Sequence, residues 1–282
     1  MLKQIKFIAV LVLCLAGCKE EVPVVKLSVE GLTTGFVMPS GKFKIALNQP
    51  ATIRTTAGLA VQDSKDTLVF TAPNTVGNCQ IIVKNLRDAQ DSLILNAVVS
   101  PKAEVFKALQ SGGYSLVFRH TAADVGADLL ASTVPNWWKM CDSNIARQLN
   151  EQGKKDAQKI GSVFKLGQIP IERIISSEFC RCFTTADLMG LSKTIMTNAD
   201  LTFWVYSEAN RYANTMKVAN SQPIDNKNTV LVIHAGFSNP PTPAPLNSLA
   251  WGDAAVFKLG SGQTSTYITT LKVTDFTELI KN

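Results

Sequence analysis

Residues 116–124 read LVFRHTAAD, an apolar run that ends abruptly at Arg119 and His120. The sequence contains only two histidines, and the second, His234, also follows an apolar run, in TVLVIHAGFSN. Short apolar runs of this kind are typical of strands that are buried on both faces of a parallel sheet. Parallel strands present their carboxyl ends at one edge, where open α/β sheets bind ligands. A single histidine after a strand is most often structural, but two at equivalent positions favour a functional site.

The sequence around these runs alternates between helical and strand patterns. NEQGKKDAQKIGSVFKLGQ places Ala157, Ile160, Val163 and Phe164 at helical spacing, and IERIISS follows as a strand. Further predicted elements are a short helix at Ala103–Gln110, a helix that begins in CRCFTTADLMGL, and a closing strand pair, AAVFKL and TYITTLKV. Strands that alternate with helices predict an α/β domain over residues 103–282, with three layers and a mostly parallel sheet.

The N-terminus has the pattern of an export signal. MLKQIK is basic, FIAVLVLCLA is apolar but too short to span a bilayer, and LAGC leads directly to Cys18. LAGC resembles the lipobox of bacterial lipoproteins, which implies a signal peptide at residues 1–17, lipidation of Cys18 and a tether at residues 18–23. An ordinary signal peptide is the alternative. The prediction is a protein of the bacterial cell envelope that is anchored by lipid and faces the periplasm or the cell surface.

Residues 24–99 have a different pattern. Six strand-like runs, VVKLSVEG, KFKIALN, ATIRTTAG, TLVFTAP, NCQIIVKNL and SLILNAVV, are separated by turn-forming residues. Such spacing predicts an all-β sandwich. The stretch from PATIRTTAG to NCQIIV resembles bacterial immunoglobulin-like modules. It contains no histidine and no acidic cluster, which favours a spacer or scaffold, with binding of a ligand or partner by its loops as the alternative.

Composition limits the classes of function. With 46% hydrophobic and 18% charged residues, the chain is expected to form well-packed cores. Removing Lys3 and Lys6 with the signal peptide lowers the formal net charge from +6 to +4, which is too small and too scattered to predict nucleic-acid binding. No C-x-x-C pair or histidine lies near the cysteines, so no metal site is predicted.

Three motifs in order resemble the histidine phosphatase superfamily, which has a phosphoglycerate mutase-like fold. Arg119-His120-Thr121 is similar to its Arg-His-Gly signature, SSEFCRCFTTA to its second motif, and the strand that ends in His234 to its third. ARQLNEQGKKDAQKIG resembles its connecting helix. The resemblance spans roughly residues 114–275 and implies an α/β phosphatase domain that needs no cofactor or metal.

A group of small extracytoplasmic members is more similar still. They have Asp four residues after the histidine, a Cys shortly before Arg-x-Leu, and a Cys directly before the arginine of the second motif. Asp124, Cys141 and Cys180 occupy these positions. The resemblance therefore implies a Cys141–Cys180 disulfide, which the oxidising envelope permits. Cys79 is then expected to be a buried thiol of the sandwich.

The resemblance also implies a role for each residue of the motifs. His120 would attack phosphorus and become phosphorylated, while Arg119, Arg181 and His234 would bind the phosphoryl oxygens. Guanidinium groups suit this task because their planar fork matches phosphate geometry. Thr121 departs from the pattern, since a β-branched residue replaces the usual glycine. We expect it to tighten the pocket.

The acid that protonates the leaving group is less clear in the sequence. Asp124 is favoured because it lies just beyond His120, and Asp253 in WGDAAVF is the next choice. Glu178 and Glu208 are further candidates.

Two segments could line the substrate entrance. The Pro-rich segment at residues 238–245 is either a stiff rim or a surface connection, and Trp137 and Trp138 either stack on a substrate or pack internally, with packing favoured.

The sequence therefore predicts a lipid-anchored, extracytoplasmic phosphatase that hydrolyses a phosphomonoester through a phosphohistidine on His120. Its expected partners are a phosphorylated small molecule or glycan and, through the anchor, a membrane. The alternative is a catalytically weak, phosphatase-like lipoprotein that binds phosphorylated or anionic glycans.

Overall fold

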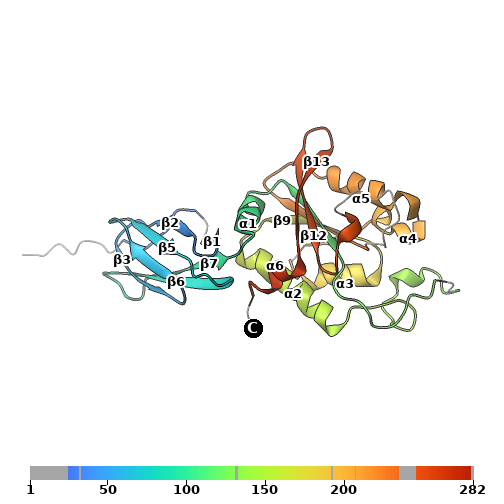
Figure 1. The fold of residues 1–282 in the computed structure, drawn as a ribbon, viewed down its shortest axis with the longest axis horizontal. Helices are drawn as coiled ribbons and strands as arrows, with labels where there is room; N and C mark the ends of the chain where they lie inside the picture. The colour runs from blue at the N-terminus through green and yellow to red at the C-terminus, as the bar shows by residue number, and fades with distance from the viewer. Residues whose placement is uncertain are drawn as a thin grey trace, which may run out of the picture.

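A computed structural model describes residues 25–280, apart from 32, 131–132, 192, 207 and 235–245. The predicted signal peptide, the tether, Cys18 and the Pro-rich segment therefore lie outside the described residues. Two parts follow one another along the chain and lie side by side along the long axis of the molecule (Figure 1). Within the described ranges, no helix is both long and apolar enough to cross a membrane.

The N-terminal part is built from strands only, within the residues described. One sheet has the order β1-β7-β6-β3 and the other β2-β5-β4. Their bounds are β1 Thr34–Val37, β2 Lys42–Ala46, β3 Ala51–Thr55, β4 Leu59–Gln62, β5 Thr67–Thr71, β6 Gly77–Asn85 and β7 Ser92–Val99. Buried and more exposed residues alternate along most of β6, as expected for a strand with one face in a core. Leu68, Phe70 and Ile81 are fully buried in that core, and Cys79 is buried with them.

The strand assignment differs from the prediction at two places. VVKLSVEG was expected to be a strand, but among its described residues only Val29 forms a β-bridge, with Leu47, and the first strand is β1, which was not predicted. β4 was not predicted; it has four residues, and its exposed and intermediate positions alternate. The described residues from 25 to 99 thus form seven strands in two sheets, while the immunoglobulin-like sandwich remains a prediction.

The C-terminal part is a six-stranded sheet with the order β10-β9-β11-β8-β12-β13. β10, β9, β11 and β8 pair in parallel, and β12 and β13 close the sheet antiparallel, as predicted. The strands are β8 Tyr114–Arg119, β9 Ile171–Ser176, β10 Ile195–Thr197, β11 Asn228–Ile233, β12 Ala254–Gly260 and β13 Thr264–Leu271. The helices are α1 Ala103–Gln110, α2 Glu151–Leu166, α3 Cys180–Leu188, α4 Phe203–Tyr206, α5 Arg211–Asn220 and α6 Val273–Thr277. Short 3-10 turns are η1 Trp137–Lys139, η2 Ala199–Leu201, η3 Glu208–Asn210 and η4 Leu246–Ser248.

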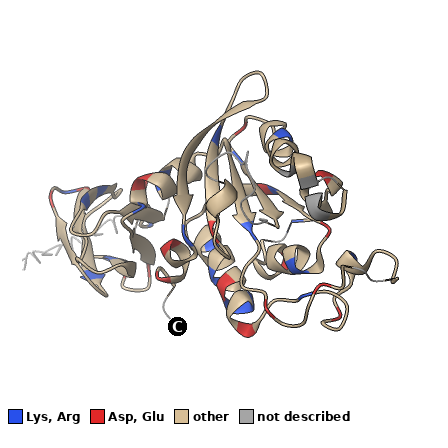
Figure 2. Ribbon diagram, turned by 45° about the vertical axis from the view of Figure 1, so that its right-hand side comes forward, with Lys and Arg blue, Asp and Glu red and all other residues tan. Residues whose placement is uncertain are grey.

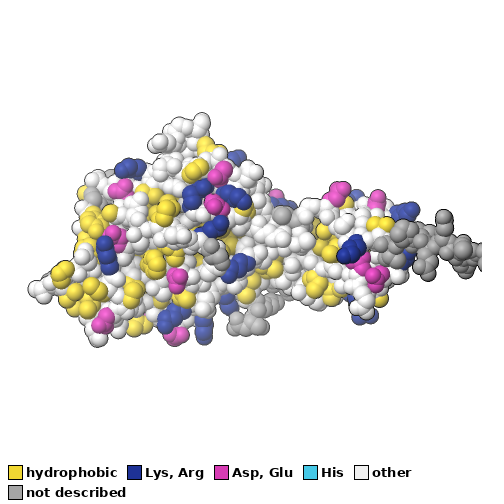
Figure 3. All heavy atoms as spheres, turned by 180° about the vertical axis from the view of Figure 1, so that it is seen from behind, with side chains coloured by type: hydrophobic (Ala, Val, Ile, Leu, Met, Phe, Trp, Pro, Cys, Tyr) yellow, Lys and Arg dark blue, Asp and Glu magenta, His cyan; other side chains and the backbone are white. Residues whose placement is uncertain are grey.

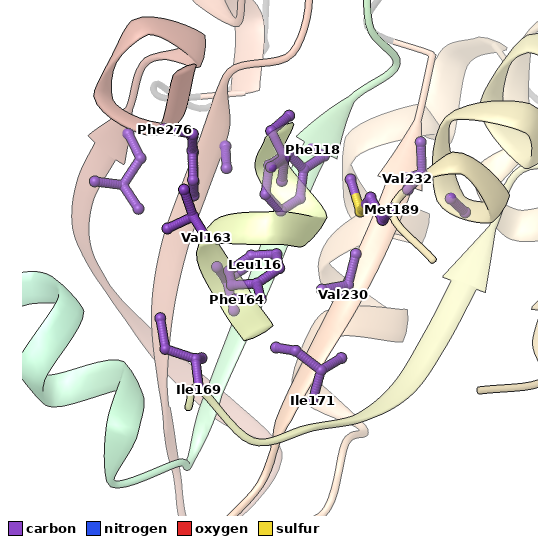
Figure 4. Packing of buried hydrophobic residues seen from close by; sticks show 14 of the residues in the cluster. Leu116, Phe118, Val163, Phe164, Ile169, Ile171, Met189, Val230, Val232 and Phe276 are labelled. Atoms are coloured by element: carbon purple, nitrogen blue, oxygen red, sulfur yellow. The ribbon is translucent and has the colours of Figure 1, made fainter. Parts of the chain in front are cut away.

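Two apolar layers cover the sheet, so the part has three layers. Phe118 and Val232 face α1, α2, α3 and α6, whereas Val117 and Leu231 face α5. In the first layer, side chains of β8 and β11 point toward Val163 and Phe164 of α2 and toward Phe276 of α6 (Figure 4). β8 and β11 are therefore anchored on both faces, which holds the residues at their carboxyl ends in place.

The two parts share an apolar junction. Phe36 of β1 stacks on Phe106 of α1 with ring centroids 4.9 Å apart, and Val98 of β7 belongs to the same core as the α/β part. Gln110 Nε2 donates hydrogen bonds to the carbonyls of Thr34 and Gly167. The sheets thus separate near residues 99–103, but the packing is continuous across this boundary.

Charged residues of both signs are interspersed along the ribbon of the two parts (Figure 2). On the face drawn in Figure 3, Lys and Arg lie close to Asp and Glu, and no histidine is visible. Both histidines are buried, at 0% and 5% exposure for His120 and His234. The two histidines therefore do not form part of the outer surface.

Candidate active site

The two histidines lie side by side at one edge of the sheet. Arg119, the last residue of β8, pairs with Ile233, the last of β11, so that each strand delivers a histidine at the same level. The His120 backbone N–H donates to the Ile233 carbonyl at 3.0 Å. The two rings are parallel within 2°, and His120 Nε2 is 3.2 Å from His234 Nδ1. The predicted pairing of the scarce histidines is therefore present in the structure.

The hydrogen bond of His120 determines which ring nitrogen is free to react. His120 Nδ1 is 2.7 Å from the carbonyl oxygen of Thr121. A carbonyl can only accept, so Nδ1 holds the proton. The Nε2 of the neutral ring then has its lone pair directed toward His234, and it is the nitrogen that can act as a nucleophile.

Burial holds the pKa of both histidines well below the usual range, and the positive charge of Arg181 lowers it further. Arg119 and Arg147 act in the same direction on both rings. Both imidazoles are therefore neutral near pH 7, and His120 is in its nucleophilic form without prior loss of a proton.

Three arginines surround these rings. Arg119 ends β8, Arg181 lies in the first turn of α3, and Arg147 precedes α2. Arg181 is fully buried, with Nη2 at 3.2 Å from His234 Nδ1 and its guanidinium carbon 4.3 Å from the centre of the Phe179 ring. Arg119 Nη1 donates to the Leu249 carbonyl. The Nε of each arginine is buried and has no hydrogen-bond partner among the described residues.

The histidine–arginine cluster, which consists of His120, His234, Arg119, Arg147 and Arg181, has an excess of positive charge. Asp128 forms ion pairs with Arg181 at 3.0 Å and with Arg147 at 3.5 Å. Among the described residues, no other carboxylate forms an ion pair with an arginine of the cluster. Buried donors without partners and buried unpaired charge are both costly. An oxyanion would supply the missing acceptors and the missing negative charge, so the cluster is suited to bind one.

Thr121 joins the first motif to the second. Its backbone N–H donates to Thr185 Oγ1 at 3.2 Å, its hydroxyl is 3.2 Å from the same atom, and Thr185 donates to the Arg181 carbonyl. Gly153 lets α2 approach the neighbouring backbone, because a Cβ there would lie 2.1 Å from the Ala122 carbonyl oxygen. The threonine in the glycine position is thus buried against α3.

The carboxylates predicted to be the acid are occupied elsewhere. Asp124 is exposed and accepts a hydrogen bond from the side chain of Asn150, the residue that caps α2. Asp253 accepts the backbone N–H groups of Ala250 and Val273, one with each oxygen. Neither carboxylate has a hydrogen bond to a residue of the histidine–arginine cluster within the described part, so this geometry does not support either as the acid.

Glu178 orders the aromatic segment beside the site. Its carboxylate accepts from Trp138 Nε1 and Tyr206 Oη and pairs with Lys139 at 3.0 Å. Partial burial raises the pKa of Glu178, but the bonds from Tyr206, Trp138 and Lys139 together outweigh it and lower the pKa, so Glu178 is a poor proton donor. The side chain of Glu208 lies outside the described atoms.

Aromatic side chains extend from the site toward Trp138. Phe179 lies with its ring centre 5.5 Å from that of His234 and 6.0 Å from that of Trp137, which is 9% exposed. Trp137 therefore packs internally, as the sequence favoured.

The structure contains the disulfide between Cys141 and Cys180, with Cα atoms 5.4 Å apart. Cys180 is the first residue of α3 and directly precedes Arg181. The bond therefore attaches the segment after the first motif to the helix that supplies the most buried arginine. Cys182 is buried beside this cluster, and burial raises the pKa of its thiol to about 12.

Two residues of the site were not predicted. Arg147 was part of the Arg-x-Leu motif but was given no role, and Asp128 had no signal in the sequence. Among the residues described, no group of three or more His, Cys, Asp or Glu side chains could hold a metal ion.

No protein-family model matches the chain, and no curated protein matches it in sequence. Solved structures show a weak likeness to it. The protein histidine phosphatase SixA, in complex with tungstate, is 16% identical with a TM-score of 0.37, over 57% of this chain and 97% of that one. A mycobacterial glucosyl-3-phosphoglycerate phosphatase, in complex with inorganic phosphate, is 13% identical with a TM-score of 0.35, over 57% of this chain and 99% of that one. At these scores the chemistry of the site rests on its own geometry.

Proposed function

We propose that the protein is a phosphatase that hydrolyses a phosphomonoester through a phosphohistidine on His120. The observation on which this rests is the neutral, buried His120 Nε2 among three arginines whose Nε donors have no described partner. The Arg119-His120, SSEFCRCFTTA and His234 motifs, which resemble histidine phosphatases, support the same chemistry.

In the first step the lone pair of His120 Nε2 attacks phosphorus. The N–P bond forms as the P–O bond to the leaving group breaks, and the leaving oxygen takes the electron pair of that bond. The imidazole gains positive charge, because Nδ1 keeps its proton. The Thr121 carbonyl, 2.7 Å from Nδ1, stabilises that charge and fixes the ring.

In the second step water attacks the phosphorus of phosphohistidine. The N–P bond breaks, its electrons return to Nε2, and inorganic phosphate leaves while the proton of the attacking water goes to solvent or to phosphate. Arg119, Arg147 and Arg181 hold the phosphoryl oxygens in both steps, and removal of one such donor costs on the order of a hundredfold in turnover. The negative charge of the bound group raises the pKa of His234, so this ring can donate a hydrogen bond to it.

The location and the N-terminal part belong to the same proposal. The MLKQIK, FIAVLVLCLA and LAGC patterns support export and lipidation of Cys18, and the Cys141–Cys180 disulfide suits an oxidising envelope. The immunoglobulin-like part would act as a spacer between membrane and phosphatase. Mass spectrometry of the mature N-terminus tests this, since an acylated Cys18 is expected and a chain that still begins at Met1 contradicts it.

The activity is tested with the purified full chain, a chromogenic aryl phosphate and the variant His120→Ala. We expect turnover by the parent and none by the variant, together with an acid-labile phosphoprotein that forms only when His120 is present. Absence of turnover between pH 4 and 8 would refute the proposal. Tight binding of phosphate without turnover would instead support the alternative, a lipoprotein that captures phosphorylated or anionic glycans, which the threonine at position 121 keeps open.

A further inference from the structure

We propose that Asp128 is a positioning residue of this site, which orients Arg181 and Arg147 and weakens the hold on phosphate enough for it to leave. The inference deepens the proposed phosphatase function and rests on it. Asp128 does not contact His120 in any described hydrogen bond; it acts through the two guanidinium groups that it binds.

The burial of Asp128 is unusual for its place in the chain. It lies in the irregular segment between β8 and α2, where its neighbours Ala127 and Leu129 are exposed, yet its own side chain is only 6% exposed. Carboxylates in such segments normally remain in water, because burying one is costly without partners. The side chain is therefore directed inward by the contacts that it makes there.

These contacts use both carboxylate oxygens. Oδ1 accepts from Arg181 Nη1 at 3.0 Å and from the backbone N–H of Arg147 at 3.0 Å, and Oδ2 lies 3.5 Å from Arg147 Nη2. One side chain thus joins a guanidinium from α3 to another that precedes α2. Removing it would leave the two guanidinium groups without their shared anchor.

The segment that contains Asp128 is itself fixed to that of Arg147. Val125 and Gln148 exchange backbone hydrogen bonds, at 3.3 and 2.8 Å, and the Leu129 N–H donates to the Ile145 carbonyl. Asp128 lies between these two attachments, so its carboxylate has little freedom to move away from the cluster. Its distance from Arg181 is set by the backbone as well as by charge.

The ion pair also determines which edge of Arg181 is available. Asp128 occupies Nη1 and His234 lies against Nη2, whereas Nε is buried without a described partner. A guanidinium held in this way presents one defined edge to an oxyanion. At the same time, the negative charge of Asp128 competes with the oxyanion for the same arginines and opposes its binding.

Asp128 is thus expected both to orient Arg181 and to oppose binding of the oxyanion. Loss of these two effects should give a different result from loss of the fold. Asp128→Asn keeps the shape of the side chain but removes its charge. We expect inorganic phosphate to inhibit this variant more strongly, with an inhibition constant lower by about fivefold or more, while kcat falls by about tenfold, since phosphate leaves slowly and Arg181 is less well oriented. Damage to the fold would weaken phosphate binding and turnover together.

The matched control is Asp142→Asn, which removes the same charge from the same segment at an exposed side chain that bonds only to Asn144 among the contacts described. Its phosphate affinity should stay within about twofold of the parent, since exposed charges are screened by solvent. Asp128→Glu retains the charge but displaces it, so kcat should fall while phosphate affinity stays near that of the parent. Titration of inorganic phosphate against tryptophan fluorescence gives the affinity even if no turnover is found, which separates this test from that of the phosphatase activity. Unchanged or weaker phosphate binding by folded Asp128→Asn would overturn the proposal, and so would tighter binding by Asp128→Glu.

Discussion

The Cys141–Cys180 disulfide should contribute to both stability and turnover. Cys141→Ser combined with Cys180→Ser removes a link between residues 39 positions apart. Restriction of the unfolded chain by a closed loop of that length is worth roughly 4 kcal/mol. With a typical dependence of the free energy of unfolding on urea, the midpoint should fall by about 2 M. All four tryptophans lie after residue 103, so their fluorescence reports unfolding of the α/β part alone.

Turnover should fall even where the double variant remains folded. Cys180 directly precedes Arg181, and the disulfide attaches this end of α3 to the segment that leads to Arg147. Small displacements of groups that bind the reacting phosphoryl can cost up to about a hundredfold, so we expect a loss of at least tenfold in kcat/KM. The assay is aryl phosphate hydrolysis in buffer without urea.

Reductant provides the control for this experiment. A dithiol should lower the urea midpoint and the turnover of the parent, because cavities of about 430 and 200 Å³ are both lined by Cys141 and Cys180 and give access to the bond. It should have no effect on the double variant, since the Cys141–Cys180 bond is the disulfide that it reduces within the described residues. If the midpoint and the turnover of the double variant equal those of the parent, the disulfide neither stabilises the fold nor holds the site.

Two further predictions concern protonation. Burial and Arg181 hold the pKa of His120 and His234 below about 6.5, so between those depressed values and 6.5 the unfolded chain binds more protons than the folded one. The free energy of unfolding should therefore fall as the pH drops from 7 toward 5, whereas kcat/KM should persist below pH 6.5; a urea midpoint that rises on acidification would contradict this. Asp124, Asp253 and Glu178 bond elsewhere, and residues 235–245 contain no Asp or Glu. We therefore expect kcat/KM to favour nitrophenyl over alkyl phosphates by about a hundredfold or more, and equal rates would require an acid at the site.

The parts of the site that the sequence predicted are those mounted on the sheet. The apolar runs before His120 and His234 are strands because nearly every residue in them is buried, and parallel pairing then brings their ends together. Arg181 was found because it directly follows a third strand and turn in a recognisable motif. Each of these residues lies a short, fixed number of positions after a strand that the apolar pattern reveals, so the local sequence is sufficient to place it.

Asp128 and the acid could not be placed in that way. Asp124 and Asp128 lie in one irregular segment, and nothing in the spacing indicates that the first bonds to Asn150 at the surface while the second reaches Arg181, 53 residues later. The direction of each side chain depends on the attachment of Val125 to Gln148, a contact between loop residues. Tertiary contacts of this kind have no sequence period, which is why the less prominent acid is the one in the site.

The arginines of the site repel one another, and the same excess of positive charge makes the site suited to an oxyanion. Two neutral imidazoles and three guanidinium groups lie close together, opposed by one ion-paired carboxylate within the described residues. The cost of this arrangement is offset by the apolar layers on both sides of β8 and β11, which hold the strand ends in place whether or not a ligand is present. In the proposed reaction a bound phosphoryl group would remove the imbalance, and Asp128 would limit how far it does so. In this proposal the sheet holds the binding groups rigidly, and the arginines keep enough unpaired positive charge to bind phosphate. Asp128 reduces that charge, so that phosphate can also leave.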